Sequence, residues 1–438
     1  MSIPGGKRLR NDADYEIMMK IHEAFLNPEK GKSTEASTEG FCMADLTEIS
    51  KSYYKKALGR LTEAETMDML DGGFALRPLS DKIKLFAGCN DAEAVKKTLE
   101  TALNRMGVAS ADSVRKNVSN WMKPGTVSIA KKSALQIAFA LGLNSREADA
   151  FLAAACGEAL HWRDPEEIIA AYALDDGMSY ADMLKLRDDI LPKLHPVDER
   201  EAPEGNRFTE IVKNMVRKAD SVETLTEVLI DQQENLGKLH NTAYRDFMKM
   251  VDQLSKTDEV ALSMGQSEAL ASYGTRDILE HYLFDREIAV FRAVKGKKKE
   301  SKEEERIRQS ILSDWPNETT FSRMKNRKTD VTRKVMILLD LATCPVYSDD
   351  DTNREIWEAK GIHMDRQRFF NLHRQTMDRH LIAWGFAPLD VRAPFDWMVL
   401  CCLRPEEREN AIAEPVWTMA KMLNLYTEVM GKDDSHEE

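Results

Sequence analysis

Apolar residues recur every three or four positions along most of the chain, which is the spacing of one face of an α-helix. Between residues 46 and 67 this stripe includes Leu46, Ile49 and Tyr53, and it ends at Asp71-Gly72-Gly73, where glycine suits a helix C-terminus. Runs of alternating β-branched residues, which are typical of strands, are almost absent. The pattern therefore predicts an all-α protein.

Polar stretches divide these helices into parts. Residues 31–40 (GKSTEASTEG) have the composition of a linker and end a flexible N-terminal segment, 1–44, with a short helix. Two prolines, a glycine and five charges at 194–206 indicate a boundary, and the highly charged stretch 295–308 indicates another. We expect a helical module at 45–193, a helical middle region at 207–294, a second module at 305–430 and an acidic tail at 431–438.

The two predicted modules share a sequence pattern. Residues 148–174 align without a gap onto residues 377–403, which lie 229 positions further on. The identical pairs are Asp149/Asp378, Leu152/Leu381, Ala154/Ala383, Leu160/Leu389, Arg163/Arg392, Pro165/Pro394 and Leu174/Leu403. A basic segment and an amphipathic helix precede each copy. We interpret the copies as two related helical modules, although two helical hairpins can also share such a pattern by chance.

Composition narrows the class of protein. Of 438 residues, 42% are hydrophobic and 31% charged, the balance of a soluble globular protein. The apolar runs are far shorter than the roughly 18 residues of a membrane-spanning helix, so no membrane contact is expected. The N-terminus lacks the apolar core of a secretory signal, and the six cysteines show no Cys-x-x-Cys spacing. We therefore expect a cytoplasmic protein without disulfides or a zinc site.

Residues 94–143 carry a recognisable order of elements. A helix ends at Gly107, the segment 110–121 (SADSVRKNVSNW) follows, then Lys123-Pro124-Gly125, and the next helix ends in Ala140-Leu141-Gly142. This order resembles the helix-turn-helix of phage-repressor-type regulators, the Cro-like or xenobiotic-response-element family. The resemblance implies that segment 110–121 is a recognition helix for double-stranded DNA. The spacing after Gly107 is longer than in simple family members, and Leu103 replaces a residue that is usually small.

The residues of this helix separate into two faces. Val114, Val118 and Trp121 are spaced i, i+4 and i+7 and form one apolar stripe, so the polar side chains fall largely on the exposed side. Arginine and lysine can read guanine, and asparagine can read adenine. The candidate base-contacting residues are Arg115, Lys116, Asn117 and Asn120. The candidate phosphate-contacting residues of this module are Lys123, Lys131 and Lys132.

The second module has a basic stretch at 319–341. Phe321 and Met324 are its expected buried pair, and six cations surround them against two aspartates. The local charge is positive, although the whole chain has a formal charge of −12 and repels polyanions. The candidate phosphate-contacting residues here are Lys325, Arg327 and Lys328.

Catalytic signatures are missing from the sequence. It contains no Walker A loop, no Gly-x-Gly-x-x-Gly, no Gly-x-Ser-x-Gly and no His-Glu-x-x-His. His373 and His380 lie two helical turns apart, too far to share a metal. We expect no enzyme activity, no cofactor and no metal. The leading interpretation is a DNA-binding regulator; the alternative is an all-α adaptor or signalling protein that binds protein partners or itself through the same fold.

Overall fold

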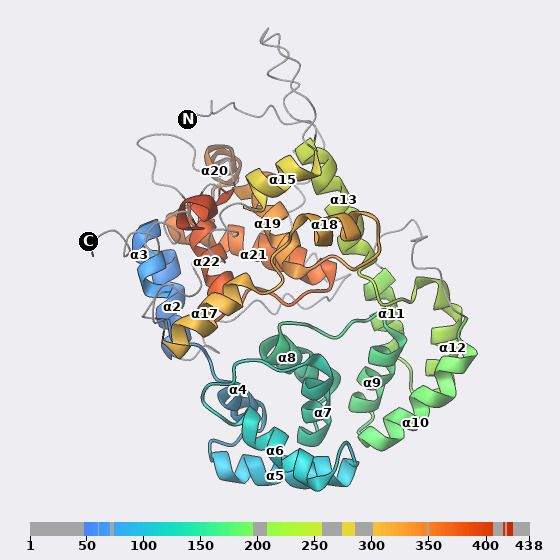
Figure 1. The fold of residues 1–438 in the computed structure, drawn as a ribbon. Helices are drawn as coiled ribbons and strands as arrows, with labels where there is room; N and C mark the ends of the chain where they lie inside the picture. The colour runs from blue at the N-terminus through green and yellow to red at the C-terminus, as the bar shows by residue number, and fades with distance from the viewer. Residues whose placement is uncertain are drawn as a thin grey trace. The chain divides into compact units, whose positions relative to one another are not determined.

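The described part of the chain is helical (Figure 1). The computed structural model describes residues 48–59, 61–70, 74–195, 208–255, 274–284, 301–347, 350–405, 415–416 and 418–423. Within these ranges the β-structure is limited to one isolated antiparallel bridge between Glu158 and Phe386. The expected all-α class is confirmed. The predicted segment 1–44 and the acidic tail 431–438 lie outside the described residues.

The chain forms two compact units, which divide it at 75–76, at 243–244 and around the short stretch 381–388. The first two divisions fall inside the predicted first module and inside the predicted middle region. The helices of the first unit are α2 (Glu48–Leu58), α3 (Glu63–Asp68), α13 (Asn241–Ser255), α15 (Thr275–Tyr282), α17 (Lys302–Leu312), α18 (Glu318–Lys325), α19 (Arg333–Thr343), η6 (Pro345–Tyr347), α20 (Asp350–Ala359), α21 (Arg366–Trp384) and α22 (Pro394–Cys402). Helix α13 begins, and α21 ends, in the other unit.

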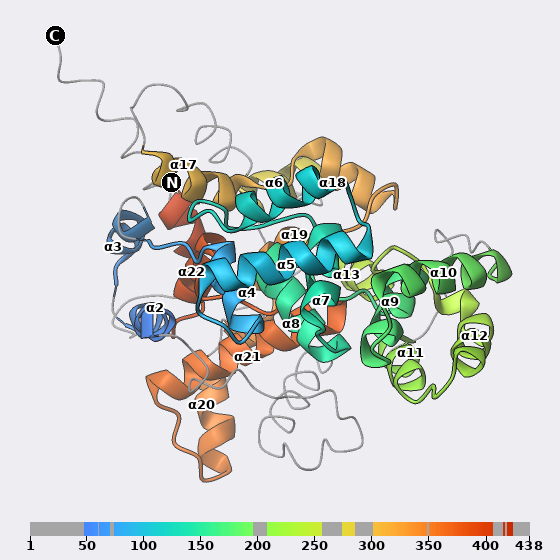
Figure 2. The same ribbon diagram turned by 90° about the horizontal axis from the view of Figure 1, so that it is seen from below.

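The second unit contains most of the first predicted module. Its helices are α4 (Leu79–Phe86), α5 (Ala92–Met106), α6 (Ala111–Trp121), α7 (Lys131–Leu141), α8 (Ser145–Cys156), α9 (Pro165–Asp175), α10 (Tyr180–Ile190), η4 (Leu191–Lys193), α11 (Phe208–Arg217), α12 (Val222–Asp231) and η5 (Gln233–Asn235). Helix α5 packs on α4, α6 and α7, and α8 packs on α4, α7 and α9 (Figure 2). Leu99, Ile137 and Phe151 are fully buried where these helices meet.

The first unit is built around two apolar helices. Every residue of α22 is buried, and so is every residue of α19 after Arg333. Trp397 of α22 packs edge-on against the stacked rings of Tyr53 and Phe74, and its indole N–H donates to the Tyr53 carbonyl at 3.1 Å. The buried indole thus has the polar partner that burial demands.

One hydrogen bond recurs at the two aligned segments. Asp149 of α8 accepts the backbone N–H of Leu160 at 2.6 Å, and Asp378 of α21 accepts the backbone N–H of Leu389 at 2.8 Å. Both donors belong to the loop that follows the helix, so each carboxylate fixes the path of the chain after its own helix. These four residues are two of the identical pairs of the sequence alignment.

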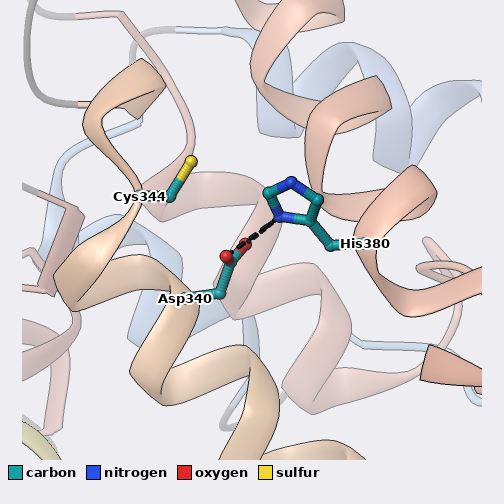
Figure 3. A group of neighbouring side chains, drawn as sticks. All are labelled: Asp340, Cys344 and His380. Atoms are coloured by element: carbon teal, nitrogen blue, oxygen red, sulfur yellow. Dashed lines mark hydrogen bonds and ion pairs between the residues drawn. The ribbon is translucent and has the colours of Figure 1, made fainter. Parts of the chain in front are cut away.

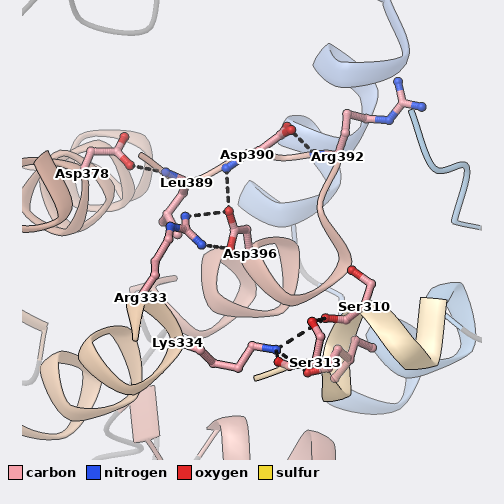
Figure 4. A network of polar contacts seen from close by, with 10 residues as sticks. Ser310, Ser313, Arg333, Lys334, Asp378, Leu389, Asp390, Arg392 and Asp396 are labelled. Atoms are coloured by element: carbon pink, nitrogen blue, oxygen red, sulfur yellow. Dashed lines mark hydrogen bonds and ion pairs between the residues drawn. The ribbon is translucent and has the colours of Figure 1, made fainter. Parts of the chain in front are cut away.

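A second arrangement also recurs. The backbone N–H of His161 donates to Glu167 at 2.6 Å, and that of Asp390 donates to Asp396 at 2.9 Å. Each of these carboxylates forms an ion pair, at 2.8 Å in both cases, with the cation that opens a neighbouring helix. The cation is Lys131 of α7 in one copy. In the other copy it is Arg333 of α19, which Figure 4 shows beside Asp396. The sequence alignment therefore corresponds to repeated local geometry.

No helix in the described ranges is both long and apolar enough to cross a membrane.

Candidate nucleic-acid interface

Helix α6 begins and ends at positions fixed by local chemistry. Gly107 closes α5 in the left-handed conformation at φ 65°, which glycine adopts without a steric penalty. Ser110 then caps α6 by accepting the backbone N–H of Ser113 at 3.4 Å. The turn between α5 and α6 therefore spans residues 107–110, and the helix predicted at 110–121 is present as Ala111–Trp121.

One face of α6 is buried and another is exposed. Val114 and Val118 are 2% and 0% exposed, which confirms the predicted inward stripe. Trp121, the third predicted member, is half-buried at the edge of the same core. Arg115, Lys116 and Asn117 are exposed. Because a helix turns by about 100° per residue, Lys116 points directly away from the buried valines, and Arg115 and Asn117 lie on its two flanks.

The exposed cations on α6 are lightly engaged. Arg115 lies 3.7 Å from Asp112, with side chains 69% and 94% exposed. Such an exposed pair contributes about 0–1 kcal/mol, so the guanidinium can leave it for a stronger acceptor at little cost. Lys116 makes no ion pair with any residue that the structure describes. The chemistry needed for base recognition is therefore available on this surface.

Asn120 and Lys123 form a local pair at the end of α6. Asn120 is half-buried, and its side-chain oxygen accepts the Lys123 ammonium at 2.6 Å. The Asn120 carbonyl also accepts the hydroxyl of Thr126 at 2.7 Å. Asn120 thus positions Lys123 and the following loop, whereas the sequence predicted that it contacts a base.

The loop between α6 and α7 is anchored to the body of the unit. The carbonyl of Thr126 accepts the N–H of Leu79, and the buried ammonium of Lys82 donates to the Val127 carbonyl at 3.0 Å. Ile129 donates its N–H to the carbonyl of Ala155 in α8 at 3.2 Å. Lys123 thus projects from a backbone that neighbouring helices hold in place.

The two lysines that open α7 differ. Lys132 is exposed and makes no ion pair with the described part of the chain. Lys131 lies 2.8 Å from Glu167 and 3.6 Å from Glu158, and its side chain is only 21% exposed. Lys131 links α7 to α9 and to the loop after α8, so its charge is already matched by carboxylates. Lys132 is the better placed of the two for a phosphate.

The helices around this surface carry a positive charge. Residues 92–141 contain eight lysines and arginines and three aspartates and glutamates, a formal charge of +5 that Glu158 and Glu167, the partners of Lys131, reduce to +3 in a chain of −12. A cluster of one sign attracts the opposite sign over roughly a Debye length, about 10 Å at 0.1 M salt. The local field around α6 therefore favours a polyanion although the whole chain does not.

Most cations of the basic stretch 319–341 contact other residues of the first unit. Phe321 and Met324 are 0% and 3% exposed, which confirms the predicted buried pair. Arg327 is only 7% exposed, and its guanidinium lies 4.5 Å from the ring centre of Tyr244. The Lys325 ammonium donates to Thr275 at 3.1 Å. Of the three candidate phosphate contacts in this module, Lys328 is the exposed one.

Two further cations of this stretch also turn inward (Figure 4). Arg333 pairs with Asp396 through both of its terminal nitrogens at 2.8 Å. Lys334 is 9% exposed and donates to the carbonyls of Ser310, Ile311 and Ser313 at the end of α17. A cation at a helix C-terminus stabilises the unpaired carbonyls there. These charges hold the first unit together.

A group of side chains absent from the sequence-based candidates lies in the first unit (Figure 3). Asp340 and Cys344 come from α19 and its C-terminal cap, and His380 comes from α21. His373, which sequence reasoning considered beside His380, bonds instead to the Leu403 carbonyl at 2.8 Å. The i, i+4 spacing of Asp340 and Cys344 was visible in the sequence, but nothing local brought His380 to them.

Comparisons with known proteins give no further guide to this surface. No family model, no curated protein sequence and no solved structure matches the chain.

Proposed function

We propose that the chain is a non-enzymatic, cytoplasmic DNA-binding regulator and that α6 is its recognition helix. The observation that carries this proposal is that Arg115, Lys116 and Asn117 are all exposed on α6, with Lys116 opposite the buried Val114 and Val118 and the other two on its flanks. The major groove of B-DNA is wide enough to admit an α-helix. A helix that presents two cations and an amide outward has the donors and acceptors that base edges require.

Each exposed residue has a role in this proposal. Arg115 and Lys116 donate to guanine, and Asn117 forms the two hydrogen bonds that adenine offers in the major groove. Lys123, just after the C-terminus of α6, and Lys132, in the first turn of α7, contact phosphates, which sets the orientation of the helix without reading sequence. Lys131, through its carboxylate partners, fixes the start of α7 behind them.

We also propose that the two aligned segments belong to related helical modules with different roles. The recurring loop hydrogen bonds of Asp149 and Asp378, and the recurring ion pairs of Glu167 and Asp396, support a common origin of the local structure. The second module has placed most of its basic side chains inside its unit. DNA recognition therefore rests on the first module, and Lys328 adds at most one phosphate contact.

The test is binding of the purified full chain to mixed double-stranded DNA fragments, followed by sequencing of the bound fraction. We expect sequence enrichment in the bound fraction, and a loss of affinity of about tenfold or more in Arg115→Ala/Lys116→Ala. The control Lys185→Ala/Lys218→Ala removes two exposed cations of the same unit away from α6 and should bind as the wild type does.

Failure of the proposal has a clear form. If the wild type binds no DNA at low salt, or if both double variants lose the same affinity, α6 is not a recognition helix. The adaptor alternative would then lead, and Leu85 on α4, which is 62% exposed, would be the first apolar contact to test against protein partners.

A further inference from the structure

The cluster of Asp340, Cys344 and His380 combines an oxygen, a sulfur and a nitrogen donor in a small volume. One ligand atom from each residue lies within 4.8 Å of the others. In the described ranges this is the one group of three or more such side chains with that proximity. Asp340 and Cys344 are 3% and 9% exposed, and the His380 side chain is 29% exposed.

The fold arranges two of the donors on one side of a helix. Asp340 and Cys344 are four residues apart on α19, so their side chains project from the same face. His380 reaches them from α21, and its Nδ1 lies 2.9 and 3.1 Å from the two Asp340 oxygens (Figure 3). The three side chains thus converge from two packed helices, which are firmer supports than loops.

The cluster also has an outer partner of the kind that metal sites use. The hydroxyl of Tyr347 donates to Oδ2 of Asp340 at 2.7 Å. Hydrogen bonds of this kind orient a ligating carboxylate and leave its other oxygen to face the ion. Oδ2 of Asp340 is therefore shared by Tyr347 and His380, whereas Oδ1 lies 2.9 Å from His380 Nδ1.

The position of Cys344 at the C-terminal end of α19 favours metal binding over a role as a nucleophile. A cysteine beside a histidine and an aspartate could be a nucleophile, but a thiolate is favoured at a helix N-terminus and disfavoured where carbonyls point. Cys344 is the C-terminal cap of α19, and its own N–H donates to the Asp340 carbonyl at 2.9 Å. The negative end of the α19 dipole lies at this cap and favours a cation there.

We propose that Asp340, Cys344 and His380 bind one divalent transition-metal ion of the zinc class. Zinc takes cysteine sulfur, histidine nitrogen and carboxylate oxygen in tetrahedral geometry. Bonds of about 2.0–2.3 Å place neighbouring ligand atoms roughly 3.3–3.8 Å apart. His380 Nδ1 and Asp340 Oδ1, 2.9 Å apart, therefore separate by about half an ångström to admit the ion, while the Cys344 sulfur lies within 4.8 Å of them. Three protein ligands leave the fourth position to water. Binding displaces the thiol proton of Cys344 and the proton of the hydrogen bond between His380 Nδ1 and Asp340, and both leave with the solvent.

The experiment is titration of chelator-treated full-length protein with Co²⁺, which reports its ligands by absorption. We expect saturation at one Co²⁺ per chain, with a thiolate-to-cobalt charge-transfer band that disappears when Zn²⁺ is added. Cys344→Ser should abolish this band. The control Cys401→Ser removes a buried thiol of the same unit outside the cluster and should retain it.

A second variant protects the test against misfolding. His380→Gln keeps the thiol and should weaken Zn²⁺ binding by at least about tenfold while circular dichroism stays unchanged. The proposal is overturned if the wild type shows no stoichiometric charge-transfer band, or if the band survives in Cys344→Ser. Alkylation of Cys344 by iodoacetamide at the same rate with and without Zn²⁺ would also overturn it, since a bound thiolate is protected.

Discussion

Replacing Asp396 by asparagine tests how much a buried charge contributes to the first unit. The Asp396 side chain is 5% exposed and receives two hydrogen bonds from Arg333 at 2.8 Å and one from the backbone of Asp390 at 2.9 Å. Asparagine keeps the shape but removes the charge. The Arg333 guanidinium, 20% exposed, then loses the negative charge of Asp396.

The expected cost follows from that loss. Removing one partner of a buried ion pair destabilises a protein by about 3–5 kcal/mol. Asparagine retains one hydrogen-bond acceptor, so Asp396→Asn should lower the free energy of unfolding by about 3 kcal/mol, the lower end of this range. The corresponding change in the other copy, Glu167→Gln, should cost only about 1 kcal/mol. There both partners are about one-fifth exposed, and Lys131 keeps Glu158 at 3.6 Å.

Urea unfolding at neutral pH, followed by tryptophan fluorescence, measures both changes. The double variant Arg333→Met/Asp396→Leu replaces the pair by apolar side chains and should recover part of the loss seen in Asp396→Asn. The reasoning is refuted if Asp396→Asn lowers the free energy of unfolding by less than about 1 kcal/mol, or if Glu167→Gln costs as much as Asp396→Asn.

Three further predictions concern the second unit. Burial, together with His240 and nearby cations, lowers the pKa of His161 to about 2, whereas an unfolded histidine titrates near 6.5. Between these values the unfolded chain takes up a proton that the folded chain does not. The free energy of unfolding therefore falls by about 1.4 kcal/mol per pH unit as the pH drops below 6.5. His161→Phe should make the free energy of unfolding less dependent on pH between pH 6.5 and 5.5, and an unchanged slope would contradict this. Gly385→Ala should cost about 1–3 kcal/mol, because φ is +88° and a Cβ would lie 2.7 Å from the His240 ring. Gly142→Ala is the control, because its φ is +67° but an added Cβ would meet no atom within 4 Å. It should cost about 1 kcal/mol, and equal losses in the two variants would exclude a steric contribution at Gly385. Ser110→Ala removes the cap of α6 and should cost about 0.5–2 kcal/mol and speed amide exchange in its first turn, whereas unchanged exchange would argue against the cap.

Local patterns were sufficient to predict the helices around the proposed interface. The apolar spacing of Val114 and Val118, and the glycines at 107 and 142, indicate which face turns inward and where α5 and α7 end. These features depend on residues within one or two turns of each other, so the sequence carries them directly.

Which basic side chains are buried and which are exposed could not be predicted in this way. Arg333 and Asp396 are 63 positions apart, and Lys334 finds its carbonyl partners 21 to 24 positions away. Whether a cation is solvated or buried depends on such distant groups, and a run of lysines and arginines has the same composition in either case. The convergence of His380 on Asp340, 40 positions away, is hidden for the same reason.

The salt dependence of DNA binding tests the central claim most directly. Fluorescence anisotropy of a labelled duplex, measured over a range of salt concentrations, gives the slope of log affinity against log salt. We predict that Lys123→Ala/Lys132→Ala reduces that slope by about 2 without changing the preferred sequence, since each phosphate contact contributes about 0.9. We predict that Arg115→Ala/Asn117→Ala changes the preferred sequence. Wild-type binding that is insensitive to salt, or variants with the slope and sequence preference of the wild type, would contradict the assignment of α6 as the DNA-reading helix.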